Sequence, residues 1–258
     1  MNHTPAITVQ NVCKTFRVLP RKDTTVLYRL SGMLGQRGQV NIPRSIDALR
    51  DIRFTVNRGE VLGVIGTNTS GKSTLLRILA GILKADSGSV DMRGRITALM
   101  DLSASLQSTL SMRDNITLAC LFFGIPRSSL PSLLPSIMEF AEGQMYLDMY
   151  PFQISNGMRQ RILFSAAMHT TPEILLLDEV FSAGDIGFRA RAMRKMKDVI
   201  RNVETTVVMV SHDPYEIRSV CDRVLWLEGG RMRQIGQTED VLNAYTDYVT
   251  QSAVASAG

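Results

Sequence analysis

The stretch "VLGVIGTNTSGKST", residues 61–74, decides the fold. Its apolar start reads as a strand, the run "TLLRILAGIL" that follows reads as a helix, and the segment between them satisfies G-x-x-x-x-G-K-[ST]. Such a loop directs backbone N–H groups at phosphates, aided by the positive end of the helix. The predicted phosphate-binding residues are Gly66, Thr67, Asn68, Thr69, Ser70, Gly71, Lys72, Ser73 and Thr74. Lys72 would reach the β- and γ-phosphates, and the Ser73 hydroxyl would ligate magnesium.

Two other apolar runs end in acidic or histidine side chains. The run "ILLLDE" ends in Asp178, which would hold magnesium through water, and Glu179, which would act as general base. Two acids after an apolar strand are more often a solvated strand end, but a phosphate loop about a hundred residues earlier reverses that preference. His212 closes "VMVSHD", and strand ends are where open α/β sheets carry their sites. Taken alone, His212 is equally consistent with a structural role.

Short β-rich runs alternate with helical ones, which predicts an α/β fold with a mixed sheet. The predicted strands are residues 7–9, 52–56, 61–65, 173–178, 206–210 and 223–227. Between about 110 and 170 the pattern is helical and no strand is predicted, so we expect a helical subdomain inserted in the sheet. We predict one domain over residues 1–258, with a short C-terminal helix and tail over about 238–258, of which residues 251–258 would be frayed.

Composition excludes several classes of protein. With 258 residues and 45% hydrophobic content, the chain can bury a large core. The net charge of +5 suits nucleic acid, an anionic membrane or a phosphate compound, without selecting among them. Three widely spaced cysteines suggest neither a disulfide framework nor zinc, which favours a reducing cytoplasm. No apolar run reaches the roughly 18 residues of a membrane span, so a membrane role would require a partner.

The segment "ISNGMRQR", residues 154–161, starts a predicted helix with an unusual charge pattern. The first turn of a helix favours acids, yet this one carries Arg159 and Arg161 and no acid. We interpret this start as an anion site.

Two basic stretches have a structural and a functional interpretation. Residues 17–47 hold six basic side chains against two acids and read either as a loose basic loop or as an insertion that acts near the membrane. Residues 188–202 also hold six basic side chains and are predicted to be a solvated helix face.

The phosphate loop, the Ser-x-Gly turn, "LLLDE", "SAGD" and "VSHD", in this order, resemble the ATP-binding subunit of ABC transporters over nearly the whole chain. The resemblance implies the following roles. Phe16 would stack on adenine, while Ser155 and Gly157 would contact the γ-phosphate of ATP held by a second copy, which would be the anion of the "ISNGMRQR" turn. Residues 182–185 would signal across the dimer. His212 would contact the γ-phosphate and help fix the attacking water.

This sequence departs from the family pattern at several positions. Thr69 stands where the family usually has glycine, and a β-branched residue resists positive φ, so we expect a remodelled loop. The turn lacks a second glycine, although Asn156 tolerates left-handed geometry. We assign Gln107 as the glutamine that contacts nucleotide and magnesium and links the site to the permease, with Asp101 as the alternative.

The turn "SNGMRQR", the loop "SAGD", the compact "QSTLSMRDN" and the long insertion after Phe16 together resemble the ATPases that export capsular polysaccharide and O-antigen, of the short type. That resemblance implies ATP and Mg²⁺ as cofactors and a homodimer of ATPase chains that pairs with two permease copies. It also implies a lipid-linked glycan as cargo and a peripheral position on the cytoplasmic face of the inner membrane. The alternatives are an ABC ATPase for another cargo, such as a drug or nutrient, and a nucleic-acid-associated ABC ATPase. With one phosphate loop and no sustained heptads, no nucleic-acid partner is expected.

Overall fold

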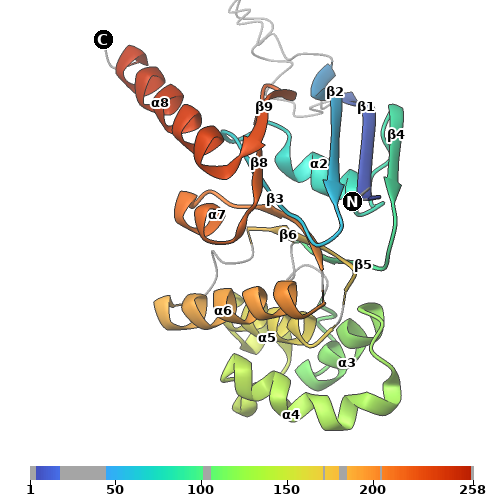
Figure 1. The fold of residues 1–258 in the computed structure, drawn as a ribbon. Coiled ribbons are helices and arrows are strands. Elements are labelled where there is room, and N and C mark those ends of the chain that lie inside the picture. Colours follow the sequence, from blue (N-terminus) through green and yellow to red (C-terminus); the bar gives the residue numbers. More distant parts are fainter. Residues whose placement is uncertain are drawn as a thin grey trace, which may run out of the picture.

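The computed structural model contains two β-sheets, with a separate helical lobe below the larger one (Figure 1). It describes residues 4–17, 45–100, 106–170, 172–179, 185–203 and 205–256. The smaller sheet is antiparallel, in the order β2 (Ser45–Asn57), β1 (Pro5–Arg17) and β4 (Ser87–Met92). The larger sheet has the order β5 (Ile96–Leu99), β6 (Ile174–Asp178), β7 (Thr206–Val210), β3 (Val61–Ile65), β8 (Arg223–Glu228) and β9 (Arg231–Gln237).

The larger sheet is parallel except for β9, and its central strands are buried on both faces. Alternate residues of a strand point to opposite faces. In β3, Leu62 and Val64 therefore enter the core shared with the smaller sheet, while Val61 and Ile65 enter the core on the opposite side. This double burial explains why the central strands read as uninterrupted apolar runs.

Helix α2 (Lys72–Leu79) lies between the two sheets and buries Leu75, Leu76 and Leu79. Gly71 precedes it with a φ of 107°. A Cβ at this position would lie 2.5 Å from the Ala48 carbonyl oxygen, so only glycine fits between the helix start and β2.

Four helices cover the opposite face of the larger sheet: α5 (Asn156–Met168), α6 (Ile186–Val203), α7 (Pro214–Val220) and α8 (Thr238–Ser256). In α6, the buried residues Phe188, Ala192, Met196 and Val199 recur at helical spacing. None of the basic side chains of α6 from Arg189 to Lys197 is buried. The predicted solvated face is only partly correct, because Arg189 and Arg191 form ion pairs within the chain.

Helices α3 (Met112–Phe122) and α4 (Leu130–Ala141) form the helical lobe around part of α5, with three short 3₁₀ turns at Arg127–Ser129, Gln144–Tyr146 and Pro151–Gln153. No strand occurs in residues 106–170. Asn115 is buried and binds the chain that leads into α3: its side chain donates to the carbonyl oxygens of Gln107, Leu110 and Ser111, and accepts from Gln107 N at 2.8 Å.

The structure corrects the predicted limits of several elements. Strands β4, β5 and β9 were not predicted, because they are edge strands that need no continuous apolar run. Residues 251–256, predicted to be frayed, continue α8, whose Tyr245 and Tyr248 pack against Trp226 while Arg233 stacks on Tyr248. The predicted insertion of residues 17–47 overlaps the β1–β2 ladder, in which Arg17 pairs with Ser45. Its middle, residues 18–44, lies outside the described residues.

Replacing Asn115 by Ala should lower the free energy of unfolding by about 2–3 kcal/mol, because it removes the hydrogen bonds that this buried side chain makes to the backbone of Gln107, Leu110 and Ser111. Thr117→Ala is the matched control in the same helix, since its hydroxyl donates to the Arg113 carbonyl oxygen of its own helix. The control should change stability by less than about 0.5 kcal/mol. Urea denaturation followed by circular dichroism measures both, and equal losses would contradict the role given to Asn115.

Candidate functional site

A cleft of about 300 Å³ lies where the phosphate loop meets the ends of β6 and β7. It is lined by Phe16, Ile46, Asp47, Ala48, Asn68, Thr69, Ser70, Gly71, Lys72, Ser73, Thr74, Glu179 and His212. Most of the residues proposed from sequence for nucleotide and catalysis thus meet in one cleft. They meet because β3, β7 and β6 are parallel neighbours, so their carboxyl ends share one edge of the sheet.

The phosphate loop requires positive φ angles at several residues. Glycine adopts such angles without strain, whereas threonine does so at a cost. Gly66 has a φ of 149°, and a Cβ there would lie 2.2 Å from the Leu227 carbonyl oxygen. Thr69 adopts a φ of 67°, so the β-branched residue takes the left-handed conformation despite its cost. Lys72 Nζ donates to the carbonyl oxygens of Gly66 and Thr67 at 2.8 and 2.9 Å, which holds the ammonium inside the loop.

The charges of Lys72 and Asp178 are both disfavoured by burial. Desolvation lowers the pKa of Lys72, against the opposing attraction of Glu179 and Asp178. Desolvation likewise raises the pKa of Asp178, although the Ser73 hydroxyl hydrogen-bonds to its carboxylate. Among the residues that the structure describes, none is a hydrogen-bond partner of the buried Oδ1 of Asp178. An unpaired buried carboxylate oxygen beside a hydroxyl suits a hard divalent cation.

The residues present fit magnesium held jointly with a phosphate ligand. In the part of the chain that the structure describes, no cluster of three or more His, Cys, Asp or Glu side chains could hold a metal by itself. Magnesium does not need one, since it is commonly bound through one or two protein oxygens together with phosphates and water. Ser73 and Asp178 supply such oxygens beside the loop.

Glu179 and His212 form the polar end of the cleft. His212 Nε2 lies 2.6 Å from Glu179 Oε1, and both side chains are about half exposed. Glu179 has a φ of 52° and donates its N–H to the Val210 carbonyl oxygen at 3.0 Å. A non-glycine residue in the left-handed region is strained, and strain of this kind often marks functional sites.

Phe16 stands at the mouth of the cleft on β1, opposite Ile46 of β2. Its ring is 40% exposed and Lys14 Nζ lies 5.7 Å from the ring centroid. An exposed aromatic face at this position is suited to stacking on a planar base.

Gln107 does not line the cleft: it is exposed, and its backbone is held by Asn115. The alternative, Asp101, lies outside the described residues, as do residues 182–184 of the predicted signalling loop.

Ser155 caps α5, and its hydroxyl accepts from Met158 N at 3.3 Å. Ser155 is exposed, and a Cβ on Gly157 would have no neighbour within 4 Å, so the turn faces open space. Asn156 is the first residue of α5 and does not use the left-handed conformation considered for it.

The interpretation of Arg161 as part of an anion site is wrong. Its side chain is 10% exposed and pairs within the chain with Glu142 at 2.8 Å and Asp185 at 3.2 Å, while its guanidinium lies 4.5 Å from the Phe188 ring centroid. Sequence pattern placed Arg161 in the first turns of a helix but could not show that this face of α5 packs on α6. Arg161 is therefore not available to an anion at this turn, which leaves the backbone N–H groups at the start of α5 and the partly exposed Arg159.

Sequence reasoning missed the buried polar groups beside His212. Ser211 and Glu216 are 6% and 5% exposed and hydrogen-bond to each other. A glutamate in the short helix after "VSHD" reads as a surface residue, so only packing identifies it.

Comparison with known proteins gives consistent matches. The family model described as "ABC transporter" matches residues 49–182. The O-antigen export system ATP-binding protein RfbB of Klebsiella pneumoniae is 34% identical over 199 residues, 77% of this chain and 80% of that protein. The corresponding RfbB of Myxococcus xanthus is 34% identical over 254 residues, 98% of this chain. The teichoic acids export ATP-binding protein TagH of Listeria innocua is 35% identical over 206 residues, 80% of this chain.

The chain spans 58% of the length of the Myxococcus protein and 61% of the Listeria protein. Among solved structures, a dimeric ATP-binding cassette in a post-hydrolysis state, bound to ADP and Pi, aligns with a TM-score of 0.72 and 22% identity, covering 90% of this chain and 98% of that one. This likeness shows the fold.

Replacing Asp178 by Asn should stabilise the metal-free protein at neutral pH, because burial disfavours the ionised carboxylate. A raised pKa means that Asp178 favours the folded state when protonated and that this contribution is lost as pH rises through the folded-state pKa. The advantage of Asn should therefore disappear as pH falls below the ordinary aspartate value of 3.8. Thermal unfolding in EDTA between pH 3 and 8 measures it.

Asp148→Asn is the control for this experiment, because Asp148 is 79% exposed and pairs with Arg113 at the surface. We expect no stabilisation at neutral pH for the control. An Asp178→Asn protein that is less stable than wild type at pH 7 would contradict the argument.

Proposed function

Because the chain belongs to the ABC transporter family, we propose that it is the ATP-hydrolysing subunit that powers export of a lipid-linked polysaccharide of capsule or O-antigen type. The observation that carries the hydrolytic role is the cleft in which Lys72, Glu179 and His212 meet beside the Asp178 oxygen, which has no hydrogen-bond partner among the described residues. Two relatives are named as ATP-binding proteins of O-antigen export and of teichoic acids export, and these names support a polysaccharide as the cargo.

In this proposal the nucleotide lies along the cleft from Phe16 to His212. Phe16 stacks on the adenine, and the backbone N–H groups of residues 66–74 bind the phosphates. Lys72 exchanges the carbonyl oxygens of Gly66 and Thr67 for phosphate oxygens, which restores an opposite charge beside its buried ammonium. Ser73 and Asp178 would hold Mg²⁺, which would supply positive charge beside the phosphates.

Hydrolysis requires a base and a group that fixes the attacking water. Glu179 accepts the proton of the water, and His212, 2.6 Å from the Glu179 carboxylate, orients that carboxylate and contacts the γ-phosphate. The strained backbone of Glu179 and its hydrogen bond to Val210 keep the base at the strand edge.

We assign the exposed turn at Ser155 and Gly157 to the ATP held by a second copy. The open space at Gly157 leaves room for a phosphate to approach the start of α5. The chain therefore acts as a homodimer in which each ATP lies between two copies.

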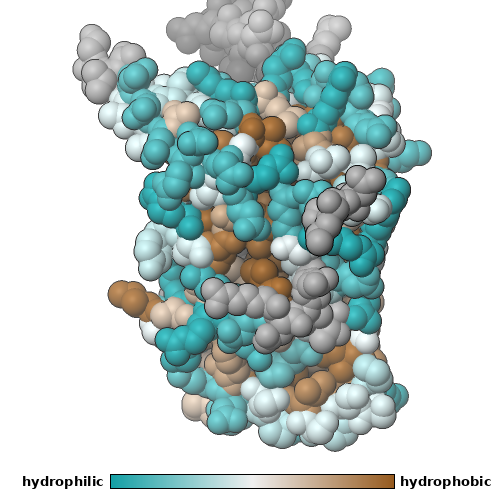
Figure 2. Space-filling model, viewed as in Figure 1, coloured by the Kyte–Doolittle hydropathy of each residue, from teal (hydrophilic) through white to brown (hydrophobic). Residues whose placement is uncertain are grey.

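A permease subunit, in two copies, is the expected membrane partner. None of the described helices is long and apolar enough to cross a membrane. Figure 2 shows hydrophobic side chains on the helical lobe, at the bottom of the view. The lobe exposes Phe122, Met145 and Phe152, at 86%, 70% and 73%, which supports a protein partner on this side. The chain would then lie peripherally on the cytoplasmic face of the inner membrane.

The cargo is tested by isolating the chain with its permease. We expect the complex to carry a lipid-linked glycan, identified by mass spectrometry, and to hydrolyse ATP faster when that glycan is added. A complex that carries and responds to a drug or nutrient instead would contradict the polysaccharide assignment.

Glu179→Gln should retain ATP binding and lower hydrolysis by roughly a hundred to ten thousand fold, because the amide cannot accept the proton of the water. Release of phosphate and equilibrium binding of a fluorescent ATP analogue measure the two effects. The control is Glu139→Gln, an exposed glutamate of α4, which should hydrolyse ATP like wild type. A Glu179→Gln protein with near wild-type turnover would remove Glu179 from this role.

A site shared between copies predicts that two inactive variants restore each other. Lys72→Ala removes the phosphate contact and Ser155→Arg blocks the turn, so neither variant alone should trap ATP in a closed dimer. In the mixed dimer both lesions fall on one site, and the other site has Lys72 facing an intact Ser155. Trapping of labelled ATP should then return, with Glu179→Gln present in both chains so that bound ATP persists. If the chains exchange partners and trapping does not return, Ser155 does not act across the dimer.

A further inference from the structure

The turn that carries His212 is held by a polar network beyond the cleft, in which Ser211 and Glu216 are buried. Ser211 follows β7, and its hydroxyl accepts from Asp213 N at 3.0 Å while it donates to Glu216 at 2.5 Å. The Asp213 carboxylate accepts from Tyr215 N at 2.9 Å and so caps α7. The residues before and after His212 are therefore fixed by the first turn of α7.

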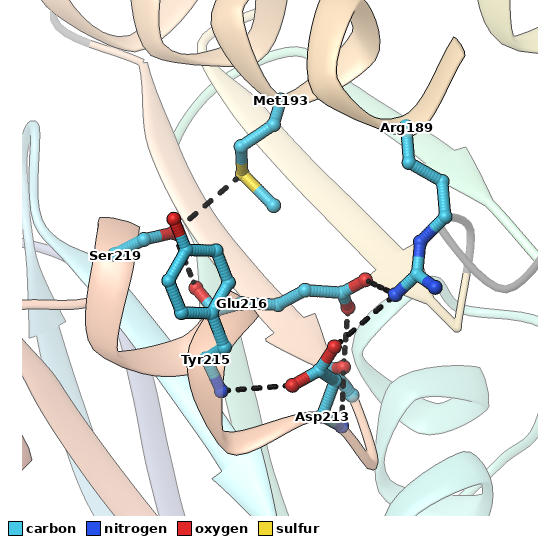
Figure 3. A network of polar contacts seen from close by, with 7 residues as sticks. Arg189, Met193, Asp213, Tyr215, Glu216 and Ser219 are labelled. Carbon is cyan, nitrogen blue, oxygen red and sulfur yellow. Dashed lines mark hydrogen bonds and ion pairs between the residues drawn. The ribbon is translucent and has the colours of Figure 1, made fainter. Parts of the chain in front are cut away.

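Arg189 of α6 connects this turn to a second helix. Its Nη2 donates to Glu216 Oε1 at 2.7 Å and to Asp213 Oδ2 at 3.1 Å (Figure 3). In that view Arg189 descends from α6 and meets both carboxylates, whereas the second link between the helices is a weak contact of the Ser219 hydroxyl with the Met193 sulfur at 3.8 Å. Arg189 is thus the strong polar link from α6 to the turn.

The burial of Glu216 makes this link more than a surface ion pair. Glu216 is 5% exposed, so its charge has lost its hydration, and Arg189 supplies the opposite charge that the site needs. By contrast, Arg218 of the same α7 binds Glu239 at 2.8 Å with both side chains about half exposed, and such pairs contribute little.

The backbone of Arg189 is held in place near the start of α6. Its backbone N–H donates to the Asp185 carbonyl oxygen at 3.0 Å, and the Asp185 side chain caps α6 through Phe188 N and pairs with Arg161 of α5. The position of the Arg189 guanidinium is therefore set by the packing of α5 and α6. The guanidinium is connected to His212 through its contact with Glu216, which in turn bonds Ser211, the residue before His212.

From this geometry we propose that Arg189 and Glu216 are positioning residues for His212: the Arg189–Glu216–Ser211 chain of contacts holds the His212 ring against Glu179. The inference rests on the proposed function only for its kinetic consequence. The structural part, that Arg189 sets the placement of the His212 ring, stands independently of catalysis.

The kinetic test compares Arg189→Met with Arg218→Met. Arg189→Met should lower kcat for ATP hydrolysis by about 10- to 100-fold and change KM by less than about 2-fold, since most of the proposed nucleotide contacts come from Phe16 and residues 66–74 and His212 contacts only the γ-phosphate. Arg218→Met should change neither by more than about 2-fold. When His212 is already replaced by Ala, adding Arg189→Met should cause no further loss, because Arg189 acts through His212. A further loss of about 10-fold in that background would overturn the proposal.

A second measurement needs no hydrolysis. The chain has three histidines, so ¹³C-histidine labelling gives three ring signals, assigned by replacing His3, His169 and His212 one at a time by Gln. At a fixed pH, Arg189→Met should shift the His212 signal and leave the His169 signal in place, and Arg218→Met should shift neither. An unchanged His212 signal in Arg189→Met would overturn the proposal even if the protein hydrolyses ATP. If wild type hydrolyses no ATP, the proposed function fails while this measurement still decides the placement of His212.

Arg189→Lys covers the case in which Arg189→Met does not fold. Lysine keeps a cation beside Glu216, but it lacks the planar guanidinium whose Nη2 contacts both Glu216 and Asp213. We expect smaller changes of the same kind in kcat and in the His212 signal. If the Lys variant has the kcat and the His212 signal of wild type, Arg189 only compensates the charge of Glu216, and its positioning role is overturned.

Discussion

The parallel pairing of β3, β7 and β6 is the constraint on which the rest of the structure depends. It brings the loop after β3, the acids that end β6 and follow it, and the histidine after β7 to one edge of the sheet. The pairing is stable because all three strands are buried on both faces. The site is thus a consequence of sheet order, since these residues are distant in sequence and share no local element.

The same edge explains why charged groups persist where burial disfavours them. Lys72 and Asp178 are both partly desolvated, and each is held by hydrogen bonds from the loop that it serves. An apolar replacement would remove the burial penalty, but it would also remove the groups that bind a phosphate and a divalent cation. The strained backbones of Thr69 and Glu179 lie at the same edge. Backbone strain and the cost of burying charge therefore both occur where the proposed chemistry takes place.

Helix α5 joins the helical lobe to the sheet. Its Leu163 and Phe164 pack in the core under the sheet, while Ile162 and Ala166 pack in the core of the lobe. Arg161 on the same helix pairs with Glu142 of the lobe and with Asp185 before α6. Arg161, which the sequence suggests as an anion ligand, therefore links the helical lobe to the start of α6. The exposed turn at Ser155 lies at the start of a helix that both cores hold in place.

The sequence by itself determined the central strands, the phosphate loop and the acids after β6, because these depend on continuous apolar runs and on a loop motif of fixed spacing. It also predicted the inserted helical region from the absence of strand patterns. Only the tertiary structure decided which charges are already paired: Arg161 with Glu142 and Asp185, and Arg189 with Glu216. It also decided that edge strands such as β4 and β9 form, and that α8 continues to Ser256. The physical reason is that ion pairing, edge pairing and helix docking depend on residues far apart in the chain, whose distances no local pattern contains.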